Sequence, residues 1–363
     1  MECFSLPPEI WLHIHRLAAP PSLLMTAHSE EFRFLSSQNP FDAFSSQDLL
    51  SFVLVSRSWN NLARELLYEN IAVPLQAGRC DTLRSALEHG AADLVRSIRL
   101  TANRADQNTA ILALCPRVQV VCQPDADRMT RLFSQSPAIS LPTFEFLKHV
   151  YWTESIMTSE LLRLLLAAAP NIEHLFLQPP SYLGLPEEDA LTLPALPHLR
   201  RLEFPGFIEH PGVQLLDLNQ LTRLNCASRL EFPPLPALET LNLTGPHQGI
   251  DLSLLFARCP RLRELTYDVW SSVIAPSPNH PPHAALDELR LHSSVTADVY
   301  NWRPIKEHFN IFVSPMFPHV RRLVLEGAWT EIVHDRRFTP FRDGLYARGC
   351  RLEFPEGVVL GRT

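Results

Sequence analysis

The sequence contains few glycines, 12 in 363 residues, and none of the glycine motifs that bind phosphates or present a nucleophile. It has no Gly-x-Gly-x-x-Gly, no Gly-x-x-x-x-Gly-Lys-Ser/Thr and no Gly-x-Ser-x-Gly. The first two motifs let a backbone approach the phosphates of a nucleotide, and the third exposes a catalytic serine at a sharp turn. Their absence argues against a nucleotide-dependent enzyme and against an α/β hydrolase.

The seven cysteines are scattered, odd in number, and never spaced as Cys-x-x-Cys. They indicate neither a disulfide framework nor a zinc site, so we expect a reducing compartment. Long apolar runs are missing too, because the most apolar stretch, residues 161–169, is short and contains Arg163. No signal-like segment opens the chain. We therefore expect an intracellular protein, cytoplasmic or nuclear, with no membrane partner.

Basic runs are also missing. The formal net charge is −7, and no run of Lys and Arg exceeds two or three residues. Such a chain repels phosphate backbones, so we expect no nucleic-acid partner. The hydrophobic content of 46% is that of a globular protein, and 363 residues exceed one ordinary domain unless the chain is a repeat array.

Prolines, in contrast, are abundant, with 32 in the chain. Many of them begin one local pattern, Pro-x-φ-x-x-φ-x-φ, in which φ is apolar. Five clear copies occupy residues 170–177, 197–204, 236–243, 260–267 and 318–325. Looser copies end at Val121, at Leu147 and His149, at Leu289 and Leu291, at Ile98 and Leu100, at Leu224 and Cys226, and at Leu352 and Phe354. The pentapeptide Arg-Leu-Glu-Phe-Pro occurs three times, from Arg201, Arg229 and Arg351, and supports internal repetition.

Each part of the pattern predicts a structure. Proline cannot continue a helix, so it marks a turn, and the two alternating φ positions after it predict a short strand with one buried face. Amphipathic segments at 106–115, 155–169 and 251–259 predict helices before several of the prolines. A recurring helix, turn and strand, rich in Leu, resembles the leucine-rich repeat in an irregular form. The resemblance implies an α/β solenoid with a curved parallel sheet. The alternative for this pattern is a doubly wound α/β enzyme.

Two N-terminal segments, residues 6–18 and 48–63, have a different character. Pro7, Pro8 and Glu9 favour the start of a helix in which Ile10 and Ile14 share one face. The second segment contains an apolar run from residue 49 to 55, and a third helix follows with Trp59, Leu62, Ala63, Leu66 and Leu67 as its stripe. So few residues cannot bury this much apolar surface alone. The excess predicts a partner, or a helical cap on the domain that follows.

The order of residue types in these segments resembles an F-box. Leu-Pro-x-Glu is followed by an Ile, then by Asp-Leu-Leu, then by Val-x-x-x-Trp. The resemblance implies a helical module at residues 1–74, with an inserted loop at 19–46 where the family has only a short connection. It assigns contact with the SKP-type adaptor of a cullin ubiquitin ligase to Leu6, Pro7, Ile10, Leu50, Val53, Val55 and Trp59.

Together the two resemblances imply a non-catalytic substrate receptor of an SCF-type E3 ubiquitin ligase, without a cofactor. Residues 75–363 would then recognise an unknown target protein. The alternatives are a leucine-rich-repeat scaffold whose N-terminal helices are only a cap and, as a third class, a hydrolase or oxidoreductase. Spacing alone suggests no catalytic set among the 15 histidines.

In such a solenoid, the side chains between the buried φ positions face a possible target. The first candidates for target contact are Phe146, Lys148, His174, Phe176, Arg201 and Glu203. The same rule adds Thr240, Asn242, Glu264, Thr266, Glu288, Arg290, Arg322 and Val324. Phe146 and Phe176 are the strongest of them, because exposed aromatics are common anchors of protein interfaces. His280 and His283 lie in a proline-rich segment that we interpret as a surface loop and not as a metal site.

Overall fold

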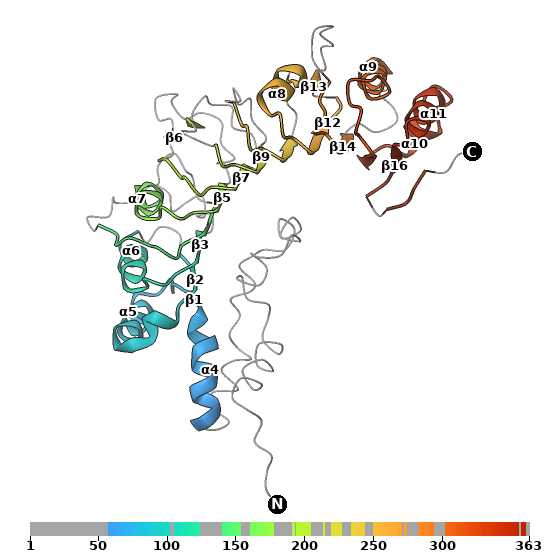
Figure 1. Ribbon diagram of the computed structural model, residues 1–363. Coiled ribbons are helices and arrows are strands. Elements are labelled where there is room, and N and C mark those ends of the chain that lie inside the picture. Colours follow the sequence, from blue (N-terminus) through green and yellow to red (C-terminus); the bar gives the residue numbers. More distant parts are fainter. Residues whose placement is uncertain are drawn as a thin grey trace, which may run out of the picture. The chain divides into compact units, whose positions relative to one another are not determined.

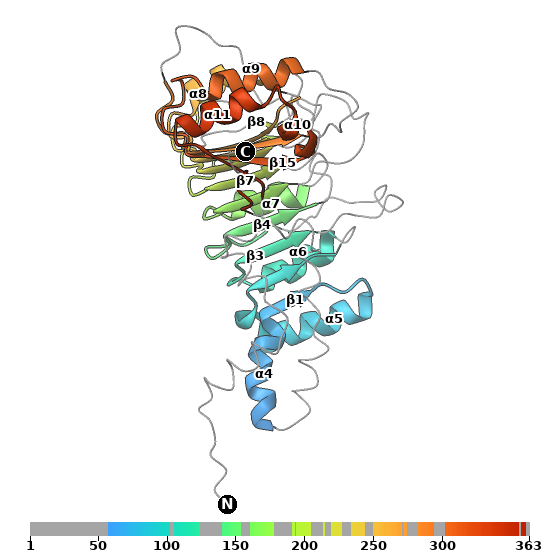
Figure 2. The ribbon, with the colours of Figure 1, turned by 90° about the vertical axis from the view of Figure 1, so that its right-hand side faces the viewer.

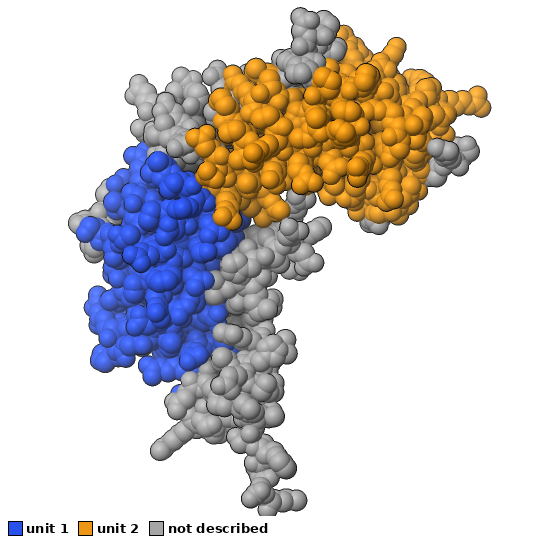
Figure 3. Space-filling model, viewed as in Figure 1, with its two compact units in different colours: residues 1–180, 193–198 blue, residues 181–192, 199–363 orange. Residues whose placement is uncertain are grey.

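The computed structural model describes residues 57–101, 105–123, 140–153, 160–177, 191–192, 194–204, 213–214, 219–226, 234–243, 250–270, 272–273, 282–293, 302–355 and 357–360. The chain divides into two compact units (Figure 3). Unit 1 comprises Met1–Pro180 and Leu193–His198, and unit 2 comprises Ser181–Thr192 and Leu199–Thr363. The inserted loop at 19–46 and the first two expected helices of the N-terminal module lie outside the described residues.

The described elements of unit 1 alternate between helices and strands. In chain order they are α4 (Arg57–Glu69), β1 (Asn70–Ala72), α5 (Ala77–Ala86), η3 (Leu87–Ala91), η4 (Ala92–Leu94), β2 (Ser97–Arg99), α6 (Ala105–Leu114), β3 (Val120–Gln123), β4 (His149–Trp152), α7 (Glu160–Ala168) and β5 (His174–Leu177). Helices α5, α6 and α7 lie on one face of these strands (Figure 1).

The described part of unit 2 begins with strands alone, and helices enter from α8 onward. Its first half holds β6 (Leu191–Thr192), β7 (Arg201–Phe204), β8 (Val213–Gln214), β9 (Arg223–Cys226), β10 (Thr240–Leu243), β11 (Ile250–Asp251) and α8 (Leu252–Arg258). Its second half holds β12 (Glu264–Asp268), β13 (Ser272–Val273), β14 (Glu288–Ser293), α9 (Trp302–Phe312), β15 (Arg322–Gly327), α10 (Thr330–His334), α11 (Thr339–Ala347) and β16 (Arg351–Glu353). Helices α8, α9 and α11 lie on one side of its strands (Figures 1 and 2).

The strands form a 12-stranded sheet in the order β1-β2-β3-β4-β5-β7-β9-β10-β12-β14-β15-β16. Neighbouring strands within each unit pair in parallel, for example β3 with β4 and β14 with β15. The short strands β6 and β8, and β11 and β13, form two further parallel pairs. The α/β fold class is therefore confirmed. The order follows the chain without the reversal of a doubly wound sheet, at which such enzymes bind their ligands.

The proline pattern produces the junction between helix and strand. Pro116, Pro236 and Pro260 each take the second position of a turn, and in each turn the carbonyl before the proline accepts a hydrogen bond from the amide three residues later. These bonds are Val118 N to Cys115 O (3.3 Å), Leu238 N to Leu235 O (3.2 Å) and Leu262 N to Cys259 O (3.2 Å). Proline suits this position because its ring fixes φ near the value that the turn needs.

The φ positions after each proline form the hydrophobic core. Ile172, Leu175 and Leu177 are fully buried, and so are Leu262, Leu265 and Tyr267 of a later copy. Burial of one such side chain contributes about 1.5–3 kcal/mol. The three helices predicted from amphipathic segments before prolines are also confirmed, as α6, α7 and α8. The first residues of the expected 155–169 helix lie outside the described residues.

The sheet begins slightly earlier than the domain boundary that the sequence suggested. Strand β1, Asn70–Ala72, falls within the range assigned to the helical module and pairs with β2. Helix α4 leads directly into it, and the carbonyl of Glu69 accepts a hydrogen bond from the amide of Arg96 at 2.9 Å. The described end of the N-terminal region is thus joined to the sheet of unit 1.

A buried histidine connects α9 to the strands of unit 2. Nε2 of His308 lies 3.1 Å from the carbonyl oxygen of Ser272, and Nδ1 lies 2.8 Å from the hydroxyl of Tyr267. A carbonyl only accepts, so Nε2 carries the proton, and in the neutral ring Nδ1 accepts from Tyr267. Burial lowers the pKa of His308 to about 4. The imidazole is therefore neutral near pH 7.

Candidate functional site

Each strand of the sheet places its φ residues against the helices and the residues between them on the opposite side, here called the second face. On β5, Leu175 and Leu177 belong to the core, and His174 and Phe176 belong to the second face. On β14, Leu289 and Leu291 belong to the core, and Glu288 and Arg290 belong to the second face. The second face carries most of the residues predicted to contact a target.

The predicted adaptor contacts fall almost entirely outside the described residues. This applies to Leu6, Pro7, Ile10, Leu50, Val53 and Val55. Trp59 belongs to α4, although its side chain is not among those described. The helix expected to contain Trp59 and Leu66 is confirmed, and the side chain of Leu66 is buried.

The register predicted around Leu147 was wrong. Strand β4 begins at His149, and its core residues are Val150 and Trp152, which pair with Leu175 and Leu177 of β5. Phe146 and Lys148 therefore precede the strand and do not lie on its second face. Phe146 is 46% exposed, and Nζ of Lys148 forms an ion pair with Glu173 at 2.7 Å.

The corrected register places His149 and Tyr151 beside His174 and Phe176 on the second face of unit 1. His174 is only 5% exposed, so the expectation that its side chain faces a target was wrong. Its Nδ1 lies 3.2 Å from the hydroxyl of Tyr151, and its ring meets those of Tyr151 and His149 edge to face. Phe176 is half-buried, with its ring 6.2 Å from that of Tyr151. This part of the second face is aromatic and mostly buried.

Arg201 and Glu203 lie on β7 in unit 2, on the second face as predicted. Nε of Arg201 and Oε1 of Glu203 form an ion pair at 2.5 Å, and both side chains are mostly buried. Arg201 begins one of the three copies of Arg-Leu-Glu-Phe-Pro. The copy that begins at Arg351 also forms a strand, β16, whereas the copy that begins at Arg229 lies outside the described residues.

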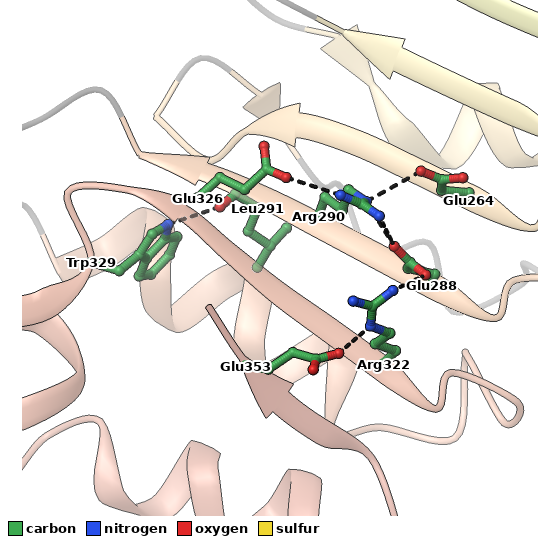
Figure 4. Close-up of polar contacts among 8 residues, drawn as sticks. All are labelled: Glu264, Glu288, Arg290, Leu291, Arg322, Glu326, Trp329 and Glu353. Atoms are coloured by element: carbon green, nitrogen blue, oxygen red, sulfur yellow. Dashed lines mark hydrogen bonds and ion pairs between the residues drawn. The ribbon is translucent and has the colours of Figure 1, made fainter. Parts of the chain in front are cut away.

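A network of ion pairs crosses the second face from β12 to β16 (Figure 4). We call it the charge ladder, and it consists of Glu264, Glu288, Arg290, Arg322, Glu326 and Glu353. The guanidinium of Arg290 contacts Glu264 at 3.2 Å, Glu288 at 2.7 Å and Glu326 at 3.3 Å.

The second cation of the ladder, Arg322, joins β15 to the strands on both sides of it. Its guanidinium contacts Glu288 at 3.0 Å and also pairs with Glu353. The hydrogen bond that Arg322 donates to Glu353 raises the pKa of Arg322, so this side chain stays charged. Sequence reasoning found Arg322 and Glu288 but missed Glu326 and Glu353. Glu326 lies two residues after Val324, so the alternation of side chains along β15 could have placed Glu326 on the second face.

A contact between a carboxylate and an imidazole lies at the carboxyl ends of β12 and β14. Oδ2 of Asp268 lies 3.2 Å from Nδ1 of His292, whose side chain is 49% exposed. This hydrogen bond raises the pKa of His292. The neighbouring Ser293 is directed elsewhere, because its Oγ accepts a hydrogen bond from Nε1 of Trp270 at 2.8 Å. Asp268, His292 and Ser293 therefore do not form a triad.

The end of β15, at Gly327, packs tightly against the end of β14, at Ser293. Gly327 has φ +87, and a Cβ placed there would lie 2.4 Å from the carbonyl oxygen of Ser293. Glycine is required at this position both by the left-handed backbone and by the close approach.

Four of the described cysteines are not activated nucleophiles. Burial raises the pKa of the Cys115, Cys259 and Cys350 thiols to about 12, and it also raises that of Cys122. Within the described ranges, no group of three or more His, Cys, Asp or Glu side chains could hold a metal ion.

The interpretation of 276–283 as a surface loop was wrong for His283. This residue is buried, its Nε2 lies 3.0 Å from the carbonyl oxygen of Cys259, and its ring contacts Phe256 and belongs to the core. His280 lies outside the described residues.

Neither a protein-family model nor a curated protein matches this chain. In the part of the chain that the structure describes, no helix is long and apolar enough to cross a membrane. The geometry of the second face supplies two kinds of contact, aromatic and imidazole groups in unit 1 and paired charges in unit 2.

Proposed function

We propose that this chain is the substrate-recognition subunit of an SCF-type E3 ubiquitin ligase. Residues 1–74 form an F-box that binds the SKP-type adaptor, and the remainder forms an irregular leucine-rich-repeat-like solenoid with a curved parallel sheet that binds a target protein. The observation that carries the proposal is the order of residue types in segments 6–18 and 48–63. Other subunits perform catalysis, and this chain holds the target where ubiquitin can be transferred.

Two features of the fold support this proposal. The strand order follows the chain, as expected for stacked repeats. The second face in unit 2 carries polar side chains that are partly exposed, such as Arg290 and Glu326. A sheet that is covered by helices on one side can present such a surface to a partner on the other.

Co-purification tests the adaptor contact. The full chain and the adaptor are co-expressed, with the double variant Leu6→Ala/Pro7→Ala and the single variant Trp59→Ala as the test proteins. We expect both variants to lose the adaptor while their thermal unfolding resembles that of the wild type. Phe146→Ala is the matched control, since it truncates an exposed aromatic outside the N-terminal module and should retain the adaptor. Adaptor binding by Leu6→Ala/Pro7→Ala and Trp59→Ala at wild-type levels contradicts the proposal.

One observation favours a repeat scaffold as a second candidate function. Helix α4 packs against β1 and η4, and its last carbonyl accepts a hydrogen bond from Arg96. This is what a helical cap does at the end of a repeat array. A wild-type chain that is folded but does not bind the adaptor would favour the scaffold over the ligase subunit.

A further inference from the structure

The sheet of unit 2 ends in a hairpin. Strand β16 is the last strand in the sheet order, and the chain reverses its direction after it (Figure 1). The amide of Gly357 donates a hydrogen bond to the carbonyl of Phe354 at 2.9 Å, and Gly357 has φ +75. A turn that closes on a left-handed glycine is common in three-residue hairpin loops. Residues 358–360, here called the returning segment, then lie antiparallel to β16.

The hydrogen bonds of this hairpin determine which backbone groups of the returning segment face outward. The amide of Phe354 donates to the carbonyl of Val358, and the amide of Leu360 donates to a carbonyl of β16, both at 3.0 Å. Glu353 and Val359 lie opposite each other between these two bonds. In such a non-hydrogen-bonded pair, the N–H and C=O of each residue point away from the other strand. The amide and carbonyl of Val359 therefore face the outer edge of the sheet.

This outer edge is also apolar and exposed. Among the described residues, the strongly exposed large apolar side chains are Leu75, Phe146, Leu254, Val358 and Val359, and only the two valines are neighbours in sequence. They are 55% and 52% exposed. Edge strands are usually protected from further pairing by charged side chains or proline, and the returning segment, Val-Val-Leu, contains neither. The edge is therefore suited to the addition of another strand.

A cation lies beside this edge without a counterion. Arg351 is the register partner of Arg322, so the two side chains are neighbours on the second face. Arg322 pairs with two glutamates, whereas Arg351 is exposed and forms no ion pair with a described residue. Like charges directly opposite each other on neighbouring strands destabilise a sheet. The packing of the sheet thus gives no reason for an arginine here, and a carboxylate from a partner would supply the missing counterion.

An added strand places such a carboxylate within reach of Arg351. Val359 lies opposite Glu353, so its side chain is on the second face, as that of Arg351 is. In a strand added antiparallel to the returning segment, one residue forms a hydrogen-bonded pair with Val359, and the residue two positions before it lies level with Arg351. Two strand spacings, about 10 Å, separate the two backbones, and an arginine and a glutamate side chain span this distance together. The matching sequence is acidic-x-apolar.

A second copy of this chain fits the edge less well. Pairing about a two-fold axis would join Val359 to itself, and Gly357 would then take the position level with Arg351. Glycine offers no carboxylate to this arginine. Each copy also has a net charge of −7, which opposes self-association.

We propose that the outer edge of the returning segment binds an extended acidic-x-apolar segment of a partner protein as an additional strand. Val359 supplies the backbone hydrogen bonds and the apolar contact, and Arg351 supplies the opposite charge. This inference rests on the proposed function only in identifying the partner as the target. The binding requires no adaptor, so it is measured on the chain alone.

Fluorescence anisotropy of the full chain with labelled peptides tests the proposal. The probe is the peptide Thr-Ser-Thr-Glu-Thr-Val-Thr-Ser-Thr, which we expect to bind with a Kd below about 1 mM. A counterpart with an N-methyl group on the valine amide lacks the donor for the carbonyl of Val359, and it should bind about tenfold more weakly. A second counterpart, with Gln in place of Glu, should bind about threefold more weakly.

Variants of the chain test the two contacts separately. Val359→Pro removes the outward amide and none of the hairpin's own hydrogen bonds, and it should weaken binding about tenfold while thermal unfolding stays unchanged. Val359→Thr is its control, because threonine keeps the amide and suits a strand. Arg351→Gln should weaken the glutamate peptide about threefold and leave the glutamine peptide unaffected. The matched control is Arg336→Gln, which removes an exposed arginine between α10 and α11.

Four results would overturn the proposal. The first three are absence of binding up to about 1 mM peptide, equal binding of the N-methylated peptide, and equal effects of Arg351→Gln and Arg336→Gln. The fourth is a wild-type dimer in sedimentation velocity that Val359→Pro converts to a monomer, because a second copy would then occupy the edge. None of them affects adaptor co-purification, so failure of this inference and failure of the proposed function are separate outcomes.

Discussion

Strands β3 and β4 of unit 1 and strands β14 and β15 of unit 2 share parallel pairing but differ in their second faces. In unit 1, Val120, Cys122 and Tyr151 of the second face are all buried. In unit 2, Arg290 and Glu326 of the second face are paired and partly exposed. The strands of a parallel sheet that is buried on both faces have nearly continuous apolar sequences. Strand β3 is an example, because it begins with Val-Val-Cys. The difference shows that these strands of unit 2 have the more accessible second face.

The largest expected effect comes from placing the same charge on both second faces. Val120→Asp puts a carboxylate at a fully buried position of unit 1, and we expect a loss of about 3 to 5 kcal/mol in the free energy of unfolding. Thr240→Asp puts it at a half-buried position of unit 2, where we expect a loss below about 1 kcal/mol. Urea unfolding measures both. Equal losses would remove the distinction between the two faces.

Lowering the pH should destabilise the folded chain through protonation of His308 in unit 2. Its pKa is lowered to about 4 in the folded state, so the unfolded chain binds more protons between about pH 6.5 and 4. The stabilisation is present above pH 6.5 and is lost as the pH falls towards 4, by about 3 kcal/mol. His308→Gln should lack this part of the pH dependence in urea unfolding. Parallel pH profiles for wild type and variant would exclude His308 as the source.

Removal of the central cation of the charge ladder should cost less. Arg290→Met leaves Glu264, Glu288 and Glu326 without a shared guanidinium, and we expect a loss of about 2 kcal/mol at pH 7. Arg303→Met is the control on the exposed surface of α9, and its effect should stay within about 0.5 kcal/mol. Equal losses for Arg290→Met and Arg303→Met would mean that the paired charges of the second face contribute no more than an exposed surface pair.

The smallest effect concerns the hydroxyl of Tyr151 in unit 1. Tyr151→Phe removes the contact with Nδ1 of His174 and should cost about 1 kcal/mol in urea unfolding. The aromatic packing remains, so the effect is limited to one hydrogen bond. A gain in stability would show that the second face of unit 1 does not need this polar contact.

The helix, turn and strand unit could be predicted from the sequence because its signals are local. Pro260 ends a helix and starts a turn, and Leu262, Leu265 and Tyr267 are buried as their alternation predicted. Near Phe144 the same signal was ambiguous, because Phe144, Phe146 and Leu147 are all apolar. Strand pairing with β5 then selects the register with Val150.

The remaining differences concern contacts between residues far apart in the chain. The burial of His174 and His283 depends on tertiary packing, which no periodicity reveals. The pairing of Arg322 with Glu353 depends on the register of β15 against β16. The sequence showed which residues share a face, but not which of them are covered or paired.

The agreement between strand order and chain order has an evolutionary and kinetic consequence. Within each unit, a strand contacts the strands that come just before and just after it in the sheet order, so most pairings join residues close in sequence. Loop-closure entropy is then small at every step, and folding can begin at several places and propagate. A whole repeat can also be gained or lost by duplication or deletion without rethreading the chain. The length of such a protein, and with it the width of its sheet, is therefore free to vary during evolution.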